Sequence, residues 1–237
     1  MSEPWKLVIL CLYAYLVGSI PTANIIARLV KGIDLREYGS GSVGGSNLFY
    51  HVGKWWLFPM GFVDLFIKGS TPIWIGHYVP FFGWELTSAE LVGAGLFAIA
   101  GHNWSAYLRF QGGRGIAVAV GVMYAIAKWQ MSLFAGIGLL FWLRTRSSGV
   151  SVYLSLLLLP IWTLVPWGPL RQPLAVTLLM VGIIGVVTAK RLLSNWTPLP
   201  EGIPKRQALF NRLFRDRDIV PRDPWVFRVP DKPRSER

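Results

Sequence analysis

Charged residues and cysteine are scarce in this sequence. Of its 237 residues only 15% are Asp, Glu, Lys or Arg, and there is one cysteine, Cys11. So few charged side chains cannot cover a soluble globule of this length, and a single cysteine excludes a disulfide framework. With three histidines and no acidic cluster, the sequence shows no metal-ligand spacing. We therefore expect no metal and no cofactor.

Apolar segments fill most of the chain, which is 53% hydrophobic and has a mean hydropathy of +0.43. We expect an all-α integral membrane protein of about seven transmembrane helices, over approximately 7–30, 56–78, 88–108, 115–127, 131–143, 151–168 and 173–189. A helix needs about 20 residues to span about 30 Å of hydrocarbon. The short fourth and fifth segments therefore form either one long span or a tightly packed hairpin.

The chain is basic, with 24 Lys and Arg against 12 Asp and Glu, but the distribution of charge does not favour nucleic acid as a partner. Twelve of the 24 lie after residue 189, and most of the others lie in short gaps between apolar segments. Such enrichment marks the cytoplasmic side of a bilayer. We therefore expect the N-terminus outside, the C-terminus in the cytoplasm, and four gaps together on the cytoplasmic face: 31–55, 109–114, 144–150 and the segment from Lys190.

We divide the chain into a membrane domain, 1–195, and a basic cytoplasmic tail, 196–237. In the tail, Leu209, Phe210, Leu213 and Phe214 fall on one helical face with basic residues around them. This pattern is typical of a short helix on an anionic leaflet. A disordered, solvated tail is the alternative.

The stretch "GSGSVGGSN", residues 39–47, lies in the first cytoplasmic gap. Consecutive glycines allow several backbone N–H groups to point inward and form a nest for an anion. Its serines and asparagine add side-chain donors for phosphate oxygens. The plainer interpretation is a flexible connector, because one glycine-rich loop is a weak signal.

A second glycine-rich loop, "GGRG", occupies residues 112–115. It places Arg114, a bidentate cation, between glycines and opens the segment 115–127, so that the positive end of that helix faces the same anion. An ordinary topogenic arginine in a tight turn is the alternative. Two such loops on one face favour a phosphate site.

Three ionisable residues in the apolar segments are candidates for function. Asp64 and Lys68 are four residues apart, in the order that favours a pair on one helix. Ionisable residues inside a membrane indicate function by default, although a self-neutralising structural pair is the alternative. His102, close to "GGRG", is a candidate anion donor or acid–base group, or it merely satisfies a neighbouring carbonyl.

Three stretches carry a family resemblance: "GSIPTANIIARLVKGIDLREYGSGSVGGSNLFYHVGKW", "DLFIKG" and "GHNWSAYLRFQGGRGIAVAVG". In this order they resemble the conserved blocks of the bacterial acyl-phosphate:glycerol-3-phosphate acyltransferases, over about residues 10–195. The resemblance implies seven helices in a bacterial cell membrane and a site facing the cytoplasm. It also implies transfer of a fatty acyl group from acyl phosphate to glycerol 3-phosphate, giving lysophosphatidic acid and phosphate without metal or nucleotide.

The resemblance assigns phosphate-site roles within the first loop, matches Lys68, His102 and Arg114 to later blocks, and aligns Ser151 with an active-site serine. Combined with the loop chemistry, it leads us to expect the catalytic residues Ser40, His102 and Ser151. The expected phosphate-binding residues are Gly39, Gly41, Ser42, Ser46, Asn47, Lys68, Gly112, Gly113, Arg114 and Gly115.

The sequence departs from the family pattern at four positions. Arg114 stands where the family usually has lysine, and Tyr50 where it has arginine; Gly185 and Thr188 stand at or near a catalytic histidine and asparagine. Arg114 keeps the charge, whereas the loss of the arginine at Tyr50 and of the histidine block favours an alternative, a non-catalytic paralogue that binds acyl phosphate or phospholipid head groups. A small anion transporter is a third hypothesis, but the apolar segments carry few polar residues.

Overall fold

The computed structural model describes residues 4–79, 86–164, 172–196 and 199–229, and these ranges contain helices but no strand. The longer elements are α1 (Pro4–Gly18), α2 (Thr22–Lys31), α3 (Gly45–His51), α4 (Leu57–Phe62), the π-helix η3 (Val63–Ser70), α5 (Thr71–Tyr78), α6 (Ser88–Asn103), α7 (Ile116–Ile126), α8 (Lys128–Thr145), α9 (Ser148–Thr163), α10 (Leu174–Leu193), α11 (Lys205–Arg215) and α12 (Asp223–Val226).

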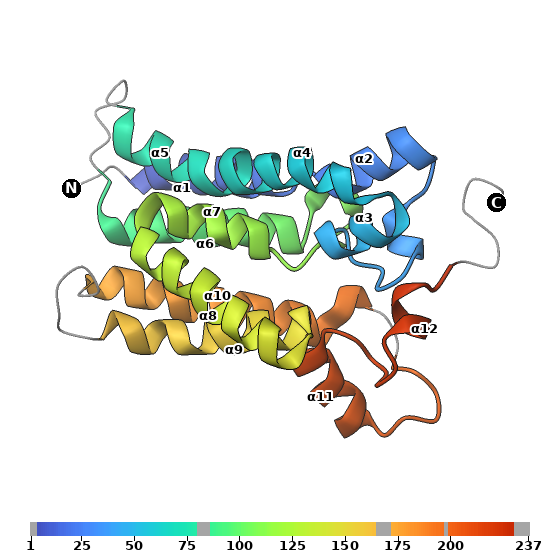
Figure 1. The fold of residues 1–237 in the computed structure, drawn as a ribbon. Helices are drawn as coiled ribbons and strands as arrows, with labels where there is room; N and C mark the ends of the chain where they lie inside the picture. Colours follow the sequence, from blue (N-terminus) through green and yellow to red (C-terminus); the bar gives the residue numbers. More distant parts are fainter. Residues whose placement is uncertain (1–3, 80–85, 165–171, 197–198, 230–237) are drawn as a thin grey trace.

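The helices form a layered bundle (Figure 1). Helices α1, α4 and α5 lie above α6 and α7, and α8, α9 and α10 lie below them. The short helices α3, α11 and α12 gather at the right-hand end, so one end of the bundle is elaborated by loops and by the C-terminal segment.

Each predicted apolar segment is largely helical over its described residues, and the first is divided in two; residues 165–168 of the sixth segment lie outside the described ranges. Residues Ser19–Pro21 separate α1 from α2, because Pro21 lacks an N–H and disfavours helical geometry in the residue before it. Two helical stretches among the described residues, Pro4–Lys31 and Leu174–Leu193, are long and apolar enough to cross a membrane by themselves. Seven crossings remain a prediction.

The fourth and fifth segments form a hairpin. Helix α7 ends at Ile126 and α8 begins at Lys128, with Ala127 outside helical geometry between them. Gly115, just before α7, and Ser148, just after α8, line the same cavity. The chain therefore leaves that end of the bundle along α7 and returns along α8, so one long span over 115–143 is wrong.

Small residues let the central helices approach closely. A Cβ added to Gly18 of α1 would overlap the carbonyl group of Ala98 on α6, and one added to Gly101 of α6 would overlap the carbonyl of Tyr15. Glycine at both positions thus permits backbone contact between α1 and α6, a packing mode typical of membrane helices.

The π-helix η3 is fixed against α7 in the same way. A Cβ added to Gly121 would overlap the Leu65 carbonyl group, and Gly69 lies against Gly121 across the contact. The Ser70 hydroxyl donates to the carbonyl oxygens of Leu65 at 3.2 Å and Gly121 at 2.9 Å. These contacts hold η3, the element that carries Asp64 and Lys68, in a geometry often found at functional sites.

The C-terminal segment packs on the bundle. The Arg212 guanidinium donates to both carboxylate oxygens of Asp218, at 2.7 and 2.9 Å, and to the Leu192 carbonyl at 3.1 Å. The Phe214 ring meets Tyr153 of α9 edge-on. The predicted amphipathic helix is therefore confirmed as α11, and the segment 199–229 contacts the bundle. The Phe210 side chain stays 54% exposed. Contact of α11 with a leaflet remains a prediction.

We predict that Gly121→Ala destabilises the fold by about 1–3 kcal/mol, because the new methyl group overpacks the contact between α7 and η3. A loss of this size lowers the thermal midpoint by roughly 2–4 °C per kcal/mol, measurable by unfolding in detergent. Gly136→Ala in α8, where an added Cβ meets open space, is the matched control. Equal midpoints for the two variants would contradict the prediction.

Candidate active site

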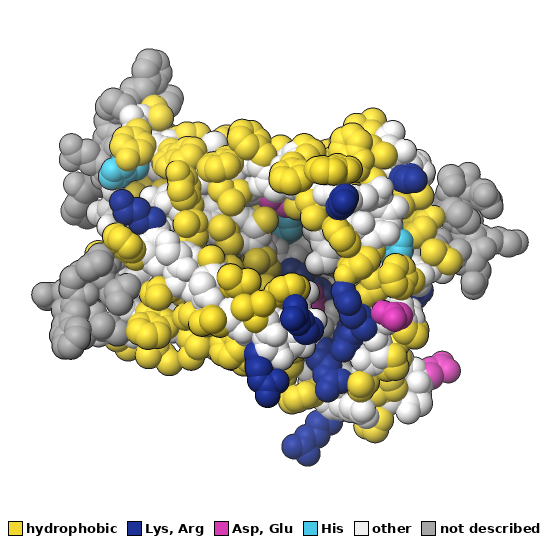
Figure 2. Space-filling model, viewed as in Figure 1, with side chains coloured by type: hydrophobic (Ala, Val, Ile, Leu, Met, Phe, Trp, Pro, Cys, Tyr) yellow, Lys and Arg dark blue, Asp and Glu magenta, His cyan; other side chains and the backbone are white. Residues whose placement is uncertain are grey.

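A cavity of about 320 Å³ opens at the elaborated end of the bundle. We call it the bundle cavity; Figure 2 shows a hollow there with basic side chains along its lower rim. Segments that are far apart in sequence meet around it: the first glycine loop, α4, η3, the end of α6, the starts of α7 and α9, the end of α10, and the tail. Its lining includes Ser40, Ser42, Ser46, Asn47, Asp64, His102, Arg114, Gly115, Ser148, Gly149, Arg191 and Asp216.

A second cavity of about 510 Å³ adjoins the first. We call it the tail cavity, because residues 215–217, 222, 225 and 226 of the C-terminal segment form one wall. The two cavities share six lining residues: Ser40, Ser46, Asn47, Ser148, Gly149 and Asp216. The expectation that the four basic gaps gather in space is thus confirmed, because each supplies residues of the two adjoining cavities. Their position on the cytoplasmic side remains a prediction.

The first glycine loop is held from inside by Asn47. Its side-chain Nδ2 donates to three backbone carbonyls, those of Leu35, Tyr38 and Ser42, at 2.9, 2.9 and 3.0 Å. Asn47 therefore shapes the loop as well as lining the cavity. The turn also requires positive φ at Gly41, +67°, which an L side chain rarely adopts.

The chain enters this loop through a carboxylate clamp. Asp34 accepts hydrogen bonds from the Arg36 Nε at 2.9 Å and from the Arg28 guanidinium at 2.8 Å. Burial alone raises the pKa of Asp34, but the hydrogen bonds from Arg36 and Arg28 outweigh burial and hold this pKa well below its usual range. The clamp is ionised at neutral pH and fixes the start of the loop.

The amides of the second glycine loop are used inside the protein. The Gly112 N–H donates to the Asn195 Oδ1 at 3.1 Å, and the Gly113 N–H donates to the His102 carbonyl at 3.1 Å. Gly39 and Gly41 likewise donate their N–H groups to backbone carbonyls. The N–H groups of these four glycines therefore hold the loops in place and are not free to bind an anion. The groups that line the bundle cavity are side chains and the first residues of helices.

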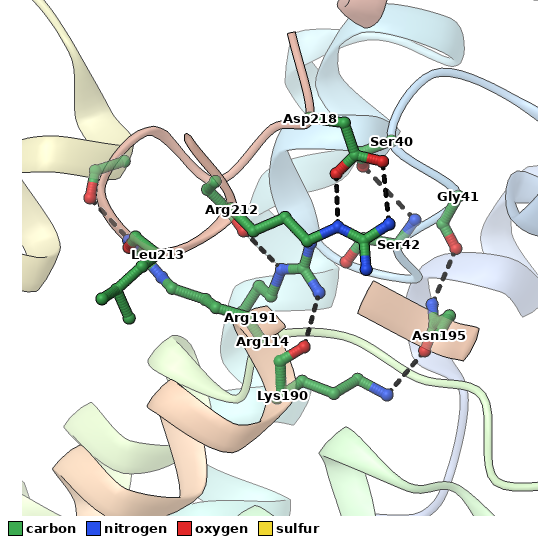
Figure 3. Close-up of polar contacts among 12 residues, drawn as sticks. Ser40, Gly41, Ser42, Arg114, Lys190, Arg191, Asn195, Arg212, Leu213 and Asp218 are labelled. Carbon is green, nitrogen blue, oxygen red and sulfur yellow. Dashed lines mark hydrogen bonds and ion pairs between the residues drawn. The ribbon is translucent and has the colours of Figure 1, made fainter. Parts of the chain in front are cut away.

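Arg114 lines the bundle cavity and is held from two sides (Figure 3). Its Nε donates to the Asp216 carboxylate at 2.6 Å, and its Nη1 donates to the Lys190 carbonyl at 3.2 Å. Gly115 follows with a φ of +72° and caps the start of α7. A cation and the positive end of a helix thus face one cavity.

Asn195 joins the two glycine loops, and Figure 3 shows its contacts with Gly41 and Lys190. Its Nδ2 donates to the carbonyls of Gly41 at 2.9 Å and Gly112 at 3.0 Å, and its Oδ1 accepts from the Lys190 Nζ at 2.5 Å. The sequence analysis missed this residue. Asn195 adopts left-handed backbone geometry after α10, at φ +55°, which asparagine tolerates better than most residues. The signal in the sequence is therefore an asparagine just after a long apolar segment.

Asp64, Lys68 and His102 lie together at the bundle cavity. The Lys68 Nζ forms an ion pair with the Asp64 carboxylate, and the His102 Nδ1 lies 3.7 Å from the second Asp64 oxygen. The predicted intrahelical pair is therefore confirmed. Asp64 and His102 line the cavity, whereas Lys68 is completely buried behind Asp64 and does not.

The remaining predicted residues lie near the site in different ways. Ser151 is 2% exposed, donates its hydroxyl to the Ser147 carbonyl at 2.7 Å, and lines neither the bundle cavity nor the tail cavity. Tyr50 lines the tail cavity and accepts a hydrogen bond from Arg222. Gly185 is exposed on α10, and the Thr188 hydroxyl bonds to that of Tyr153 at 2.8 Å, so neither of these departures lines the two cavities.

Arg191 and Asp216 are lining residues that the sequence analysis did not single out. The Arg191 guanidinium donates to the carbonyls of Leu213 at 2.6 Å and Gly149 at 3.0 Å. Arg191 therefore ties the tail to the start of α9. The charged pattern "RDRD", residues 215–218, gave a signal for the tail, but its contact with the loops depends on tertiary packing.

The arrangement of the helices is similar to that of solved membrane acyltransferases. The chain is similar to PlsY (YgiH), an integral membrane glycerol 3-phosphate acyltransferase, in its glycerol 3-phosphate form: TM-score 0.68, 28% identity, 78% of this chain and 88% of that chain. The lysophosphatidic acid form gives a TM-score of 0.65 at 26% identity, over the same shares of both chains. The protein is thus a membrane protein with the fold of an acyltransferase.

Curated relatives agree. A glycerol-3-phosphate acyltransferase of Dehalococcoides mccartyi is 34% identical over 93% of both chains, and one of Agrobacterium fabrum is 36% identical over 76% of this chain and 84% of its own. The family model described as glycerol-3-phosphate acyltransferase matches residues 8–197. The chain belongs to the glycerol-3-phosphate acyltransferase family.

We predict that Asn195→Ala separates the two glycine loops. The variant loses hydrogen bonds to Gly41, Gly112 and Lys190. We expect its free energy of unfolding to fall by about 2 kcal/mol, because each bond contributes about 0.5–1.5 kcal/mol and polar groups are left unpaired. Hydrogen exchange at the Gly112 amide should quicken by more than tenfold. Asn195→Asp keeps the acceptor for Lys190, so its exchange rate should lie between those of the wild type and Asn195→Ala. Unchanged exchange in both variants would contradict the proposed link between the two loops.

Proposed function

We propose that this enzyme transfers a fatty acyl group from acyl phosphate to glycerol 3-phosphate in the bundle cavity, on the cytoplasmic side of a bacterial cell membrane. Membership of the family makes it an acyltransferase that acts on glycerol 3-phosphate and yields lysophosphatidic acid in phospholipid synthesis. The acyl phosphate donor, the seven crossings and the orientation are the proposed part.

One observation carries the proposal: a single cavity brings cations and hydroxyl groups next to the Asp64–His102 pair. Arg114 and Arg191 offer guanidinium groups, and Ser40, Ser42 and Ser46 offer hydroxyls, on the same lining. Such groups bind phosphate oxygens and stabilise the charge that develops during acyl transfer.

The chemistry needs little more than this environment. The acceptor hydroxyl oxygen forms a bond to the acyl carbonyl carbon, the bond from that carbon to the phosphate oxygen breaks, and phosphate leaves with the electron pair. Acyl phosphate is a mixed anhydride and already activated, so the site needs positioning and charge stabilisation rather than a serine nucleophile. We propose that His102, near the Asp64 carboxylate, accepts the hydroxyl proton and that Ser40 donates to a phosphate oxygen.

The proposed orientation follows from the basic residues. The gaps that carry most of the Lys and Arg outside the tail supply residues of the two cavities: Ser40, Arg114 and Arg146 come from three of them. Since such gaps face the cytoplasm, a site there takes glycerol 3-phosphate from the cytosol and a lipid-like donor from the inner leaflet.

A non-catalytic binding protein is not favoured. The similar proteins named above are acyltransferases, over most of this chain. Gly185 and Thr188, whose identity favoured a binding protein, lie outside both cavities, while Ser40, His102 and Arg114 line the bundle cavity.

The direct test uses detergent-purified protein with palmitoyl phosphate. We expect phosphate release that depends on glycerol 3-phosphate, together with equimolar lysophosphatidic acid, and His102→Gln should lower kcat by about 10²–10⁴-fold, as expected for loss of a general base. Palmitoyl thioesters serve as the control donors. Acylation from a thioester but not from palmitoyl phosphate would refute the proposed donor.

Ser40→Ala should raise the apparent dissociation constant for inorganic phosphate by about tenfold, because a bound anion then loses a direct donor. Ser132→Ala, on an exposed part of α8 outside both cavities, is the matched control and should bind as the wild type does. Equal affinities of the Ser40 and Ser132 variants would mean that the first loop serves only as a connector.

A further inference from the structure

The tail cavity carries an excess of positive charge. Four arginines line it, from the end of α8 and from the C-terminal segment: Arg146, Arg215, Arg217 and Arg222. Among the described residues Asp216 is its one acidic lining residue, and this carboxylate already pairs with the Arg114 Nε at 2.6 Å. Figure 2 shows basic side chains gathered on this part of the surface. The lining thus attracts an anion.

Aromatic rings hold two of these arginines. The Arg222 Nη2 donates to the Tyr50 hydroxyl, and its guanidinium carbon lies 5.5 Å from the Tyr50 ring centroid. The Arg146 guanidinium lies 5.2 Å from the Trp142 ring centroid, on the same cavity. Stacked guanidinium groups lose less freedom when they bind a ligand, so these two are prepared for an anion.

Arg217 adds a buried, unpartnered donor. Its Nε is buried and has no hydrogen-bond partner within the described ranges. Burial lowers the pKa of Arg217, and the like charges of Arg215 and Arg222 lower it further. Bringing three cations together is unfavourable unless an anion binds between them.

We propose that the tail cavity binds the terminal phosphate group of a substrate, so that the C-terminal segment completes the active site; this inference rests on the proposed function. Guanidinium groups bind phosphate in bidentate geometry. Ser40 and Ser46 line both cavities, so a phosphate held by the tail leaves the rest of the substrate directed toward His102. The family match ends at residue 197, before the three tail arginines.

Two substrates carry this chemistry, glycerol 3-phosphate and acyl phosphate, and kinetics separate them. In Arg217→Gln/Arg222→Gln we expect the KM of one substrate to rise by about tenfold or more, since charge-assisted bonds to phosphate are lost, with kcat changed less. A rise for glycerol 3-phosphate assigns the cavity to the acceptor, and a rise for palmitoyl phosphate assigns it to the donor. If neither KM rises, the proposal is overturned.

The control is Lys205→Gln/Arg206→Gln, which removes the same two charges from exposed positions on α11 that line neither cavity. Its KM values should equal those of the wild type. A rise in KM as large as that of Arg217→Gln/Arg222→Gln would show that the effect comes from net charge alone and would overturn the proposal. Arg222→Lys keeps the charge but loses the bidentate donors of the guanidinium group, and we expect an intermediate KM. A wild-type KM in Arg222→Lys together with altered unfolding of Arg217→Gln/Arg222→Gln would show a structural role and overturn the proposal.

Direct binding keeps this inference separate from the proposed function. Titration calorimetry with inorganic phosphate on the full-length protein should show binding that weakens by about tenfold in Arg217→Gln/Arg222→Gln and is unchanged in Lys205→Gln/Arg206→Gln. If the wild type binds phosphate in this way but transfers no acyl group, the proposed function fails and the tail site stands. Equal phosphate affinity in all three proteins overturns the tail site whatever the activity.

Discussion

The side chain of Asn195 is the contact on which the site depends. One amide joins the Gly41 and Gly112 carbonyls and accepts from Lys190, so it fixes two loops that are far apart in sequence against the end of α10. Backbone groups in such loops have no regular partner, and leaving them unpaired in a partly buried place is costly. A single planar group with two donors and an acceptor satisfies several of them at once.

The polar groups around this tie differ in burial and in charge. Asp64 and Lys68 form a buried ion pair, and His102 lies beside it. Arg114 and Arg191 line the same cavity as Asp64 and His102, and four further arginines line the adjoining tail cavity. Positive charge therefore predominates around the two cavities, an arrangement suited to an anionic ligand.

Much of the fold could be predicted from the sequence because membrane helices need long apolar segments. All seven predicted segments are largely helical, and the two glycine loops meet at one end as the distribution of basic residues indicated. Local patterns did not decide whether residues 115–143 turn back. Ala127 looks like any helical alanine, and the turn there depends on where α7 and α8 pack.

The sequence by itself determined the class of protein, the Asp64–Lys68 pair and the residues of both glycine loops, because composition and spacing act locally. The tertiary structure decided which groups face a cavity: it turned the Gly112 and Gly113 amides inward, placed Ser151 behind the lining, and brought Asn195 and the tail to the loops. The reason is physical. Hydrogen bonds between segments 80 to 150 residues apart form only after the helices pack, and no local pattern encodes their partners.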